Sequence, residues 1–215
     1  VGVARKSITP ETPIWLSGYA SRKAPSTEIL QDLWAKALVI EESSKSRVII
    51  VTTDIIVFSH EVSEEVVMRI IEKYGIDRSQ LLLSSSHTHS GPVIWPSLNN
   101  MFDLGASDIQ ALITYSQKLV DAIVEAIDAA MNNLTPMQLY IGHGSADFAK
   151  NRRQSTDKGV VIGVNPDGPV DHDVPVLKVI TPDGKLQAVL FGYACHNTTL
   201  SINQINGDYA GFAQA

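Results

Sequence analysis

Residues 47–54 read Arg-Val-Ile-Ile-Val-Thr-Thr-Asp, a β-branched run that ends in polar residues. Such a run is typical of a buried central strand, and Asp54 falls at its carboxyl end. The segment after it predicts a helix, because Ser59 can cap it, apolar residues follow at helical spacing and Gly75 can end it. A second apolar strand follows at Gln80–Leu83. Strand, helix and strand with short turns form a βαβ unit, so we expect the two strands to be parallel.

Further elements flank this unit on both sides. The expected elements are an edge strand at Val1–Ala4, a strand at Asp32–Glu41, a helix at about Ser107–Asn132, and strands at Gln138–Gly142, Val174–Ile180 and Gln187–Ala194. The turn tetrapeptide Thr181–Gly184 predicts a hairpin between the last two strands. Gly, Asn, Asp and Pro in Lys150–Val170 predict a long loop. The order of elements favours one α/β domain over residues 1–215, with a mixed β-sheet core and flanking helices.

Composition excludes several classes of protein. The 215 residues are 44% hydrophobic and 19% charged, which is typical of a globular chain and excludes a disordered one. Cys195 is the one cysteine, so a disulfide scaffold is excluded. The net charge is −6 without a basic run, so we do not expect a nucleic-acid partner. No apolar stretch reaches the roughly 18 residues of a membrane span. The oligomeric state stays open.

Two histidines directly follow the second strand of the βαβ unit. His87 and His89 lie in the sequence His-Thr-His, and residues i and i+2 of an extended segment point to the same side. The two imidazoles can share a metal ion, or one can bind metal while the other contacts substrate. The carboxyl edge of parallel strands is where α/β folds place their sites. A hydrogen-bonded pair in a loop is the competing interpretation.

A third histidine, His196, also follows an apolar strand. If its strand neighbours the one before His87, the two histidines converge into half of a zinc site. Asp54 is a candidate ligand or a partner that orients a histidine, and capping of the next turn is an equal alternative. His60, His143 and His172 are expected to have no special role.

Two more segments contain candidate site residues. Asn206 and Asp208 precede an apolar helix face, so Asp208 is either the cap of that helix or part of an anion-binding end. Arg152 lies in the long loop, where an arginine can clamp a carboxylate, polarise a carbonyl, or simply be solvated.

Together these segments resemble the N-terminal catalytic domain of the neutral/alkaline non-lysosomal ceramidases. The similarity runs through the whole chain in order, at modest identity, and the His-Thr-His segment is its most specific part. The matching segments are Leu16–Ala20, Leu33–Ile40, Ser86–Pro92, Asn151–Arg152, Cys195–Thr198 and Asn206–Ala213.

The resemblance implies a zinc-dependent amidase that splits the C–N bond of an N-acylated lipid such as a sphingolipid. By position, it implies that His87 and His196 are zinc ligands and that a zinc-bound water is the nucleophile. It implies that His89 and Arg152 bind and polarise the amide.

Two departures shape this expectation, and one of them is Arg153, which stands where the family usually has a serine. Asn206 stands where the family has its essential serine, and an amide cannot act as a nucleophile. We therefore expect a related metal-dependent amidohydrolase rather than a strict ceramidase, with Asn206 and Asp208 still counted among the catalytic residues. The alternative is a non-catalytic or differently specific metal-binding domain of the same fold.

The ends of the chain give one more expectation. The chain begins at Val1 rather than Met and stops at Ala215 inside a motif. We expect a truncated catalytic domain whose remaining zinc ligands, a glutamate and a tyrosine in the family, lie beyond Ala215. The family resemblance also implies a secreted or periplasmic location.

Overall fold

The computed structural model describes residues 1–11 and 13–215, which group into two compact units. The first unit combines Val1–Thr135 with Asn197–Ala215, so the end of the chain returns to its beginning. The second unit is Pro136–His196. The chain therefore leaves the first unit once and comes back to it directly after His196.

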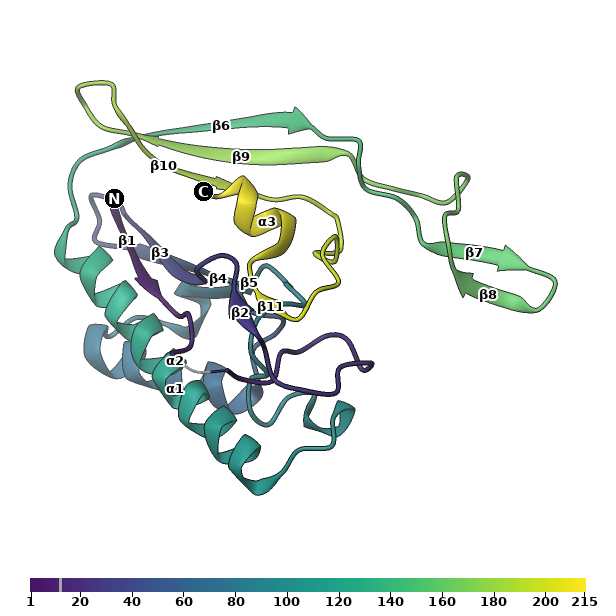
Figure 1. Ribbon diagram of the computed structural model, residues 1–215. Coiled ribbons are helices and arrows are strands. Elements are labelled where there is room, and N and C mark those ends of the chain that lie inside the picture. The colour runs from purple at the N-terminus through teal and green to yellow at the C-terminus, as the bar shows by residue number, and fades with distance from the viewer. Residues whose placement is uncertain (12) are drawn as a thin grey trace. The chain divides into compact units, whose positions relative to one another are not determined.

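A four-stranded mixed sheet is the centre of the first unit (Figure 1). The strands lie in the order β1-β3-β4-β5, with bounds β1 (Gly2–Ser7), β3 (Trp34–Glu41), β4 (Arg47–Thr53) and β5 (Leu81–Ser85). Strands β1, β3 and β4 pair antiparallel, whereas β4 and β5 are parallel. The predicted βαβ unit and the mixed sheet are thus confirmed.

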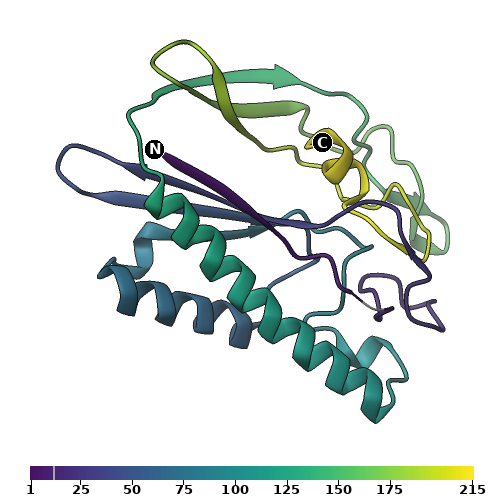
Figure 2. The same cartoon turned by 60° about the vertical axis from the view of Figure 1, so that its left-hand side comes forward.

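Two helices cover one face of this sheet, α1 (His60–Tyr74) and α2 (Ala106–Asn132) (Figures 1 and 2). The amide of Val62 donates to Ser59 Oγ at 3.2 Å, so Ser59 caps α1 as predicted. Gly75 ends the helix in a left-handed conformation, φ 61°, which costs glycine little.

The hydrophobic core of this unit lies between the sheet and the helices. Alternate residues of β3 and β4 and the inner stripes of α1 and α2 supply it, and each large apolar side chain contributes about 1.5–3 kcal/mol. Its fully buried members include Val39, Ile49, Val51, Ile70, Leu112, Leu119 and Ile123.

Short elements complete the first unit. Strand β2 (Glu28–Ile29) pairs in parallel with β11 (Gln204–Ile205), which joins the early loops to the last segment of the chain. Helix α3 (Asp208–Ala213) follows β11. Two 3-10 turns, η1 (Arg78–Gln80) and η2 (Asn99–Met101), precede β5 and α2.

The second unit contains a three-stranded antiparallel sheet in the order β10-β9-β6. Its strands are β6 (Gln138–Ser145), β9 (Asp173–Ile180) and β10 (Leu186–Phe191). The predicted hairpin of β9 and β10 is confirmed. These strands form a sheet of their own rather than extending the sheet of the first unit, contrary to the expectation of one sheet.

The segment predicted as a long loop holds a second hairpin. Strands β7 (Arg153–Thr156) and β8 (Gly159–Ile162) pair antiparallel inside Lys150–Val170, so the prediction of a structureless loop there was wrong. The β-branched residues after Gly159 favour a strand, and Gly159, at φ 107°, allows the tight reversal.

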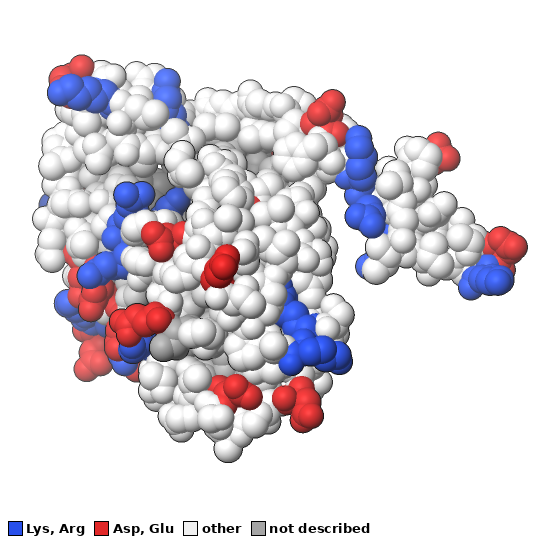
Figure 3. Space-filling view, viewed as in Figure 1, with Lys and Arg blue, Asp and Glu red and all other residues white. Residues whose placement is uncertain are grey.

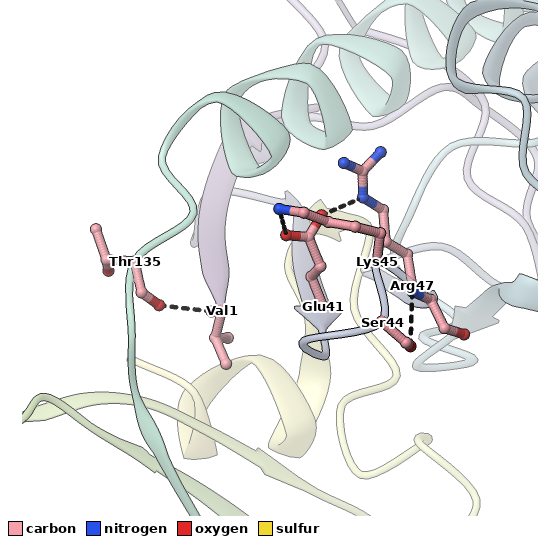
Figure 4. A network of polar contacts seen from close by, with 7 residues as sticks. Val1, Glu41, Ser44, Lys45, Arg47 and Thr135 are labelled. Carbon is pink, nitrogen blue, oxygen red and sulfur yellow. Dashed lines mark hydrogen bonds and ion pairs between the residues drawn. The ribbon is translucent and has the colours of Figure 1, made fainter.

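Charged side chains of both signs mix on the face drawn in Figure 3. One such group lies at the β3–β4 turn, where Glu41 accepts from Lys45 Nζ at 3.2 Å and from Arg47 Nε at 2.6 Å (Figure 4). The bonds from Arg47 and Lys45 hold the pKa of Glu41 below its usual value. Among the described residues, no helix is long and apolar enough to cross a membrane.

Candidate metal centre

The candidate site begins where the parallel strands β4 and β5 end side by side. Thr53 lies opposite Ser85 in the last register pair. Two further backbone bonds carry the pairing past the strands: Ser86 N to Thr53 O at 2.9 Å and His87 N to Ile55 O at 3.0 Å. The backbone of His87 then turns into the left-handed region, φ 60°. This turn fixes the direction of the His87 side chain.

The ring of His87 is oriented by a backbone carbonyl. Its Nδ1 lies 2.8 Å from the oxygen of Ile56. A carbonyl can only accept, so we assign the ring proton to Nδ1, and Nε2 then carries the lone pair. A carbonyl partner on the distal nitrogen is the usual support of a metal-binding histidine.

His89 faces the nitrogen that His87 presents. The two Nε2 atoms lie 3.4 Å apart, and the rings meet at 72°. Two imidazole nitrogens on one tetrahedral zinc ion lie about 3.3–3.4 Å apart, given Zn–N distances near 2.0–2.1 Å. Thr88 between them is fully buried, as expected if the histidines share one side of the segment. The spacing of this donor pair therefore fits a shared cation.

Thr88 joins the histidine segment to the last part of the chain. Its Oγ1 donates to Asn206 O at 3.0 Å and accepts from Ser90 N at 3.1 Å. The amide of Asn206 donates to Ser90 O at 3.2 Å. Sequence reasoning missed Thr88, although a threonine inside His-Thr-His is a small polar residue that can be buried when it is bonded.

The side chain of Asn206 is fully buried and takes part in local bonds. Its Nδ2 donates to Gln204 O at 2.9 Å, and its Oδ1 accepts from Asp208 N at 2.8 Å. These contacts shape the turn between β11 and α3. The predicted catalytic residue Asn206 is thus bonded to the His87–Ser90 segment through its backbone.

Asp208 is fully buried at the start of α3, and its cap is Gly207 rather than Asp208. Its carboxylate accepts from the Thr199 amide and hydroxyl and from the amides of Leu200 and Tyr209, at 2.6–2.9 Å. Burial favours the neutral acid, but these hydrogen bonds outweigh it and hold the pKa of Asp208 below its usual 3.8. Asp208 therefore anchors the 199–200 loop.

His196 is the last residue of the second unit. It is bonded to Asn197, whose buried side chain donates to Gly207 O at 3.0 Å and accepts from Ala210 N at 3.3 Å. Its strand, β10, belongs to a different sheet from β5, so the expected route of convergence through neighbouring strands was wrong. His87, His89 and His196 nevertheless form a group that could hold a metal ion.

Arg152 belongs to the second unit, just before β7. Its Nε donates to Gly163 O at 3.0 Å, across the base of the β7–β8 hairpin. Asn151 supports the same turn, accepting from Arg153 N at 3.0 Å and donating to Pro169 O at 3.1 Å. The guanidinium of Arg152 is exposed, and its catalytic role stays a prediction.

Asp54 is buried at the end of β4, and its oxygens accept from backbone and amide groups. Oδ2 accepts from Trp34 N at 3.0 Å, and Oδ1 accepts from Gln214 Nε2 at 3.4 Å. Gln214 in turn accepts from Lys36 Nζ at 2.8 Å. Burial raises the pKa of Asp54 above its usual 3.8, against the opposing effects of the Trp34 amide and Lys36. This carboxylate connects β4 to the residue that follows α3.

The other histidines have local partners or lie at the surface. His60 is the exposed first residue of α1. In the second unit, His143 Nδ1 lies 2.9 Å from Asp173, and His172 Nδ1 lies 2.9 Å from Ala146 O. The group that could hold a metal ion includes none of these three.

The fold and this geometry define a mixed α/β domain with a cluster of potential metal-ligating histidines beyond its parallel strands. The model of the neutral/alkaline non-lysosomal ceramidase N-terminal family matches residues 1–215. The chain belongs to this family.

Relatives of this family support the assignment. The neutral ceramidase of Pseudomonas aeruginosa is 30% identical over 220 residues, which cover 99% of this chain and 32% of that protein. The crystal structure of neutral ceramidase from the same species superposes with a TM-score of 0.79 at 28% identity, over 99% of this chain and 34% of that one. A ceramidase complexed with C2 gives 0.77 at 27%, with the same coverage. The chain thus spans about a third of these relatives.

Proposed function

We propose that this chain supplies part of the active site of a zinc-dependent amidohydrolase, which cleaves an amide C–N bond in an N-acylated lipid or small molecule. One observation carries the proposal. In a chain of the neutral ceramidase family, His87 is oriented by Ile56 O and presents its Nε2 3.4 Å from that of His89. The tautomer of His87 suits a metal ligand, and the 3.4 Å spacing puts His89 next to that ligand.

His87 and His196 are the proposed zinc ligands, as the family resemblance implies. Imidazole is a preferred ligand of zinc, so the donor set fits this metal. Bound zinc would supply Lewis acidity and activate water for attack on the amide. The Ile56 carbonyl selects the tautomer of His87, because it accepts a hydrogen bond from Nδ1.

The remaining predicted residues have distinct proposed roles. His89 and Arg152 bind and polarise the amide carbonyl, since both present N–H donors. Asn206 and Asp208 support the site through the bonds that fix the 199–208 segment. A four-coordinate zinc site needs further ligands in addition to these two histidines.

The proposed substrate class comes from the relatives, which are neutral ceramidases. Ceramide is an N-acylated lipid, so it is the first compound to test. A secreted or periplasmic location is proposed on the same resemblance.

A metal-binding domain without amidase activity is the second candidate. The observation that favours it is the Asn206 side chain, whose amide is engaged by Gln204 O and Asp208 N. An amide bonded in this way cannot replace a serine hydroxyl in chemistry.

The test measures bound metal and hydrolysis by the full-length protein, with ceramide, an N-acylethanolamine and an N-acyl amino acid as substrates. We expect about one zinc per chain, and we expect His87→Ala and His196→Ala each to lose it together with activity. His60→Ala is the matched control, since His60 is exposed on α1 and should change neither. The proposal is overturned if the wild-type protein holds no metal. It is also overturned if His87→Ala and His196→Ala both stay active. Metal binding without hydrolysis of any amide selects the second candidate.

A further inference from the structure

The backbone of Gly18 presses against the ring of His89. A Cβ atom at residue 18 would lie 2.3 Å from His89 Cγ and 2.4 Å from Nδ1, closer than any real contact. Gly18 also has φ 97°, which is a conformation that glycine adopts without strain. The loop before β2 therefore forms one wall of the His89 site, and that wall requires a residue without a side chain.

Tyr19 forms a second contact with the same ring. Its aromatic ring lies 5.0 Å from that of His89, centroid to centroid, at 63°, which is an edge-on arrangement. The Tyr19 hydroxyl donates to Leu200 O across a long 3.4 Å. His89 thus lies between a glycine backbone and an aromatic ring.

Arg22 holds Tyr19 in place. Its guanidinium carbon lies 4.8 Å from the centre of the Tyr19 ring. The guanidinium nitrogens donate to Ser17 O at 2.6 Å, Ile202 O at 3.1 Å and Asn203 Oδ1 at 3.2 Å. A planar fork that binds three acceptors and stacks on a ring has little freedom left. Arg22 also connects the 17–22 loop with residues 202–203, which lie in the segment that follows His196.

We propose that Tyr19 and Arg22, here called the Tyr19–Arg22 clasp, are positioning residues that fix the ring of His89 against His87. This inference rests on the proposed function, because a fixed ring matters only if His89 works beside a metal. The contacts pass from Arg22 to Tyr19, from Tyr19 to His89 and from His89 to His87. Residues that orient the side chains of a metal site typically change metal affinity or activity by 10–100-fold when they are replaced.

The first experiment follows His89 itself in metal-free, full-length protein with labelled histidines. The ring-proton NMR signals of His89 are compared in wild type, Tyr19→Leu, Tyr19→Phe and Arg22→Lys. We expect Tyr19→Leu and Arg22→Lys to shift these signals, whereas Tyr19→Phe, which keeps the ring, leaves them near their wild-type positions. Arg22→Lys keeps the charge and loses the fork, so it also serves as the milder variant if Tyr19→Leu fails to fold.

The second experiment measures the zinc dissociation constant and the split between kcat and KM. We expect Tyr19→Leu and Arg22→Lys to weaken zinc binding about tenfold or more. Tyr19→Phe keeps the ring and should bind zinc about as tightly as wild type. The matched control is Arg5→Lys, because Arg5 stacks on the Trp34 ring at 4.4 Å without contacting a histidine. A purely structural role would lower the unfolding temperature and leave the His89 signals and the zinc affinity unchanged.

The outcomes separate the clasp from the proposed function. If wild type binds zinc and neither Tyr19→Leu nor Arg22→Lys alters His89 or zinc affinity, the clasp is wrong and the metal site stands. If wild type binds no zinc but the His89 signals move as expected, the positioning contacts hold and the proposed function fails. A zinc affinity that falls equally in Arg5→Lys also overturns the clasp.

Discussion

His87 and Ile56 are joined by a hydrogen bond of 2.8 Å from a ring nitrogen to a backbone oxygen, at a residue whose backbone is left-handed. The bond selects the tautomer, and the backbone directs the ring toward His89. Both depend on the end of β4 running beside the end of β5, so the parallel pairing of these strands is what builds the site.

The left-handed backbone of His87 predicts different costs for two substitutions. Asparagine accepts this conformation, so His87→Asn should change the free energy of unfolding by about 1 kcal/mol or less while abolishing metal binding. The β-branched His87→Val should cost about 1–3 kcal/mol, because its side chain is strained at φ 60°. Urea unfolding and metal analysis of both variants check this. Equal stability of the two would mean that the backbone conformation does not constrain residue 87.

Gly18→Ala should be more damaging than the same change at another left-handed glycine. Both Gly18 and Gly75 have positive φ, but only at Gly18 would the new Cβ meet a ring, whereas nothing lies within 4 Å at Gly75. Gly75→Ala should lower the free energy of unfolding by about 1 kcal/mol. Gly18→Ala should lower it by about 1–3 kcal/mol more and should also weaken zinc binding. Thermal unfolding and zinc titration measure both effects. Similar losses at the two positions would contradict the close approach of Gly18 to His89.

Asp208 should control stability in acid. Its pKa is lowered in the folded protein, so its contribution is present above its usual pKa of 3.8 and is lost as the pH falls through the folded value. Asp208→Asn should therefore cost about 2 kcal/mol at pH 7 and progressively less below pH 4. The exposed Asp103→Asn is the control and should leave stability nearly unchanged. A cost that stays constant from pH 7 to pH 3 would show that the charge is not involved.

Asp54 predicts the opposite dependence on pH. Burial raises its pKa, so ionisation destabilises the fold, and this penalty develops as the pH rises from 3.8 through the folded pKa. Asp54→Asn can still accept from Trp34 N, and it should gain stability relative to wild type between pH 4 and pH 8. Asp54→Ala, which leaves the Trp34 amide without its acceptor, should cost about 1–3 kcal/mol. Denaturant unfolding at several pH values tests both, and no relative gain for Asp54→Asn would contradict the raised pKa.

The sequence was most informative where structure depends on local patterns. The β-branched run of β4, the cap at Ser59 and the stop at Gly75 predicted the βαβ unit, because each signal acts within a few residues. The alternation in His-Thr-His assumed an extended segment, whereas His87 is left-handed, so the contact between the two imidazoles depends on that turn. The β7–β8 hairpin was missed because its strands are short and polar residues surround them.

Long-range contacts could not be predicted in the same way. The carbonyl of Ile56 gives no signal in a sequence, since every residue has one. The separate sheet of β10 and the bonds that bury Asn206 depend on which distant segments meet. A single sequence therefore predicted the local elements better than the long-range bonds between them.

The pairing of β2 with β11 has a consequence for biosynthesis. Glu28 and its partner Gln204 are 176 positions apart, and the whole second unit is translated between them. At about 5–20 residues per second, the ribosome exposes β2 roughly 10–35 s before β11 emerges. During that interval the loop around Tyr19 and the newly made histidine segment lack the Asn197–Ala215 surface. A chaperone that shields nascent chains would therefore meet this protein before the histidine segment has gained its contacts with residues 197–215.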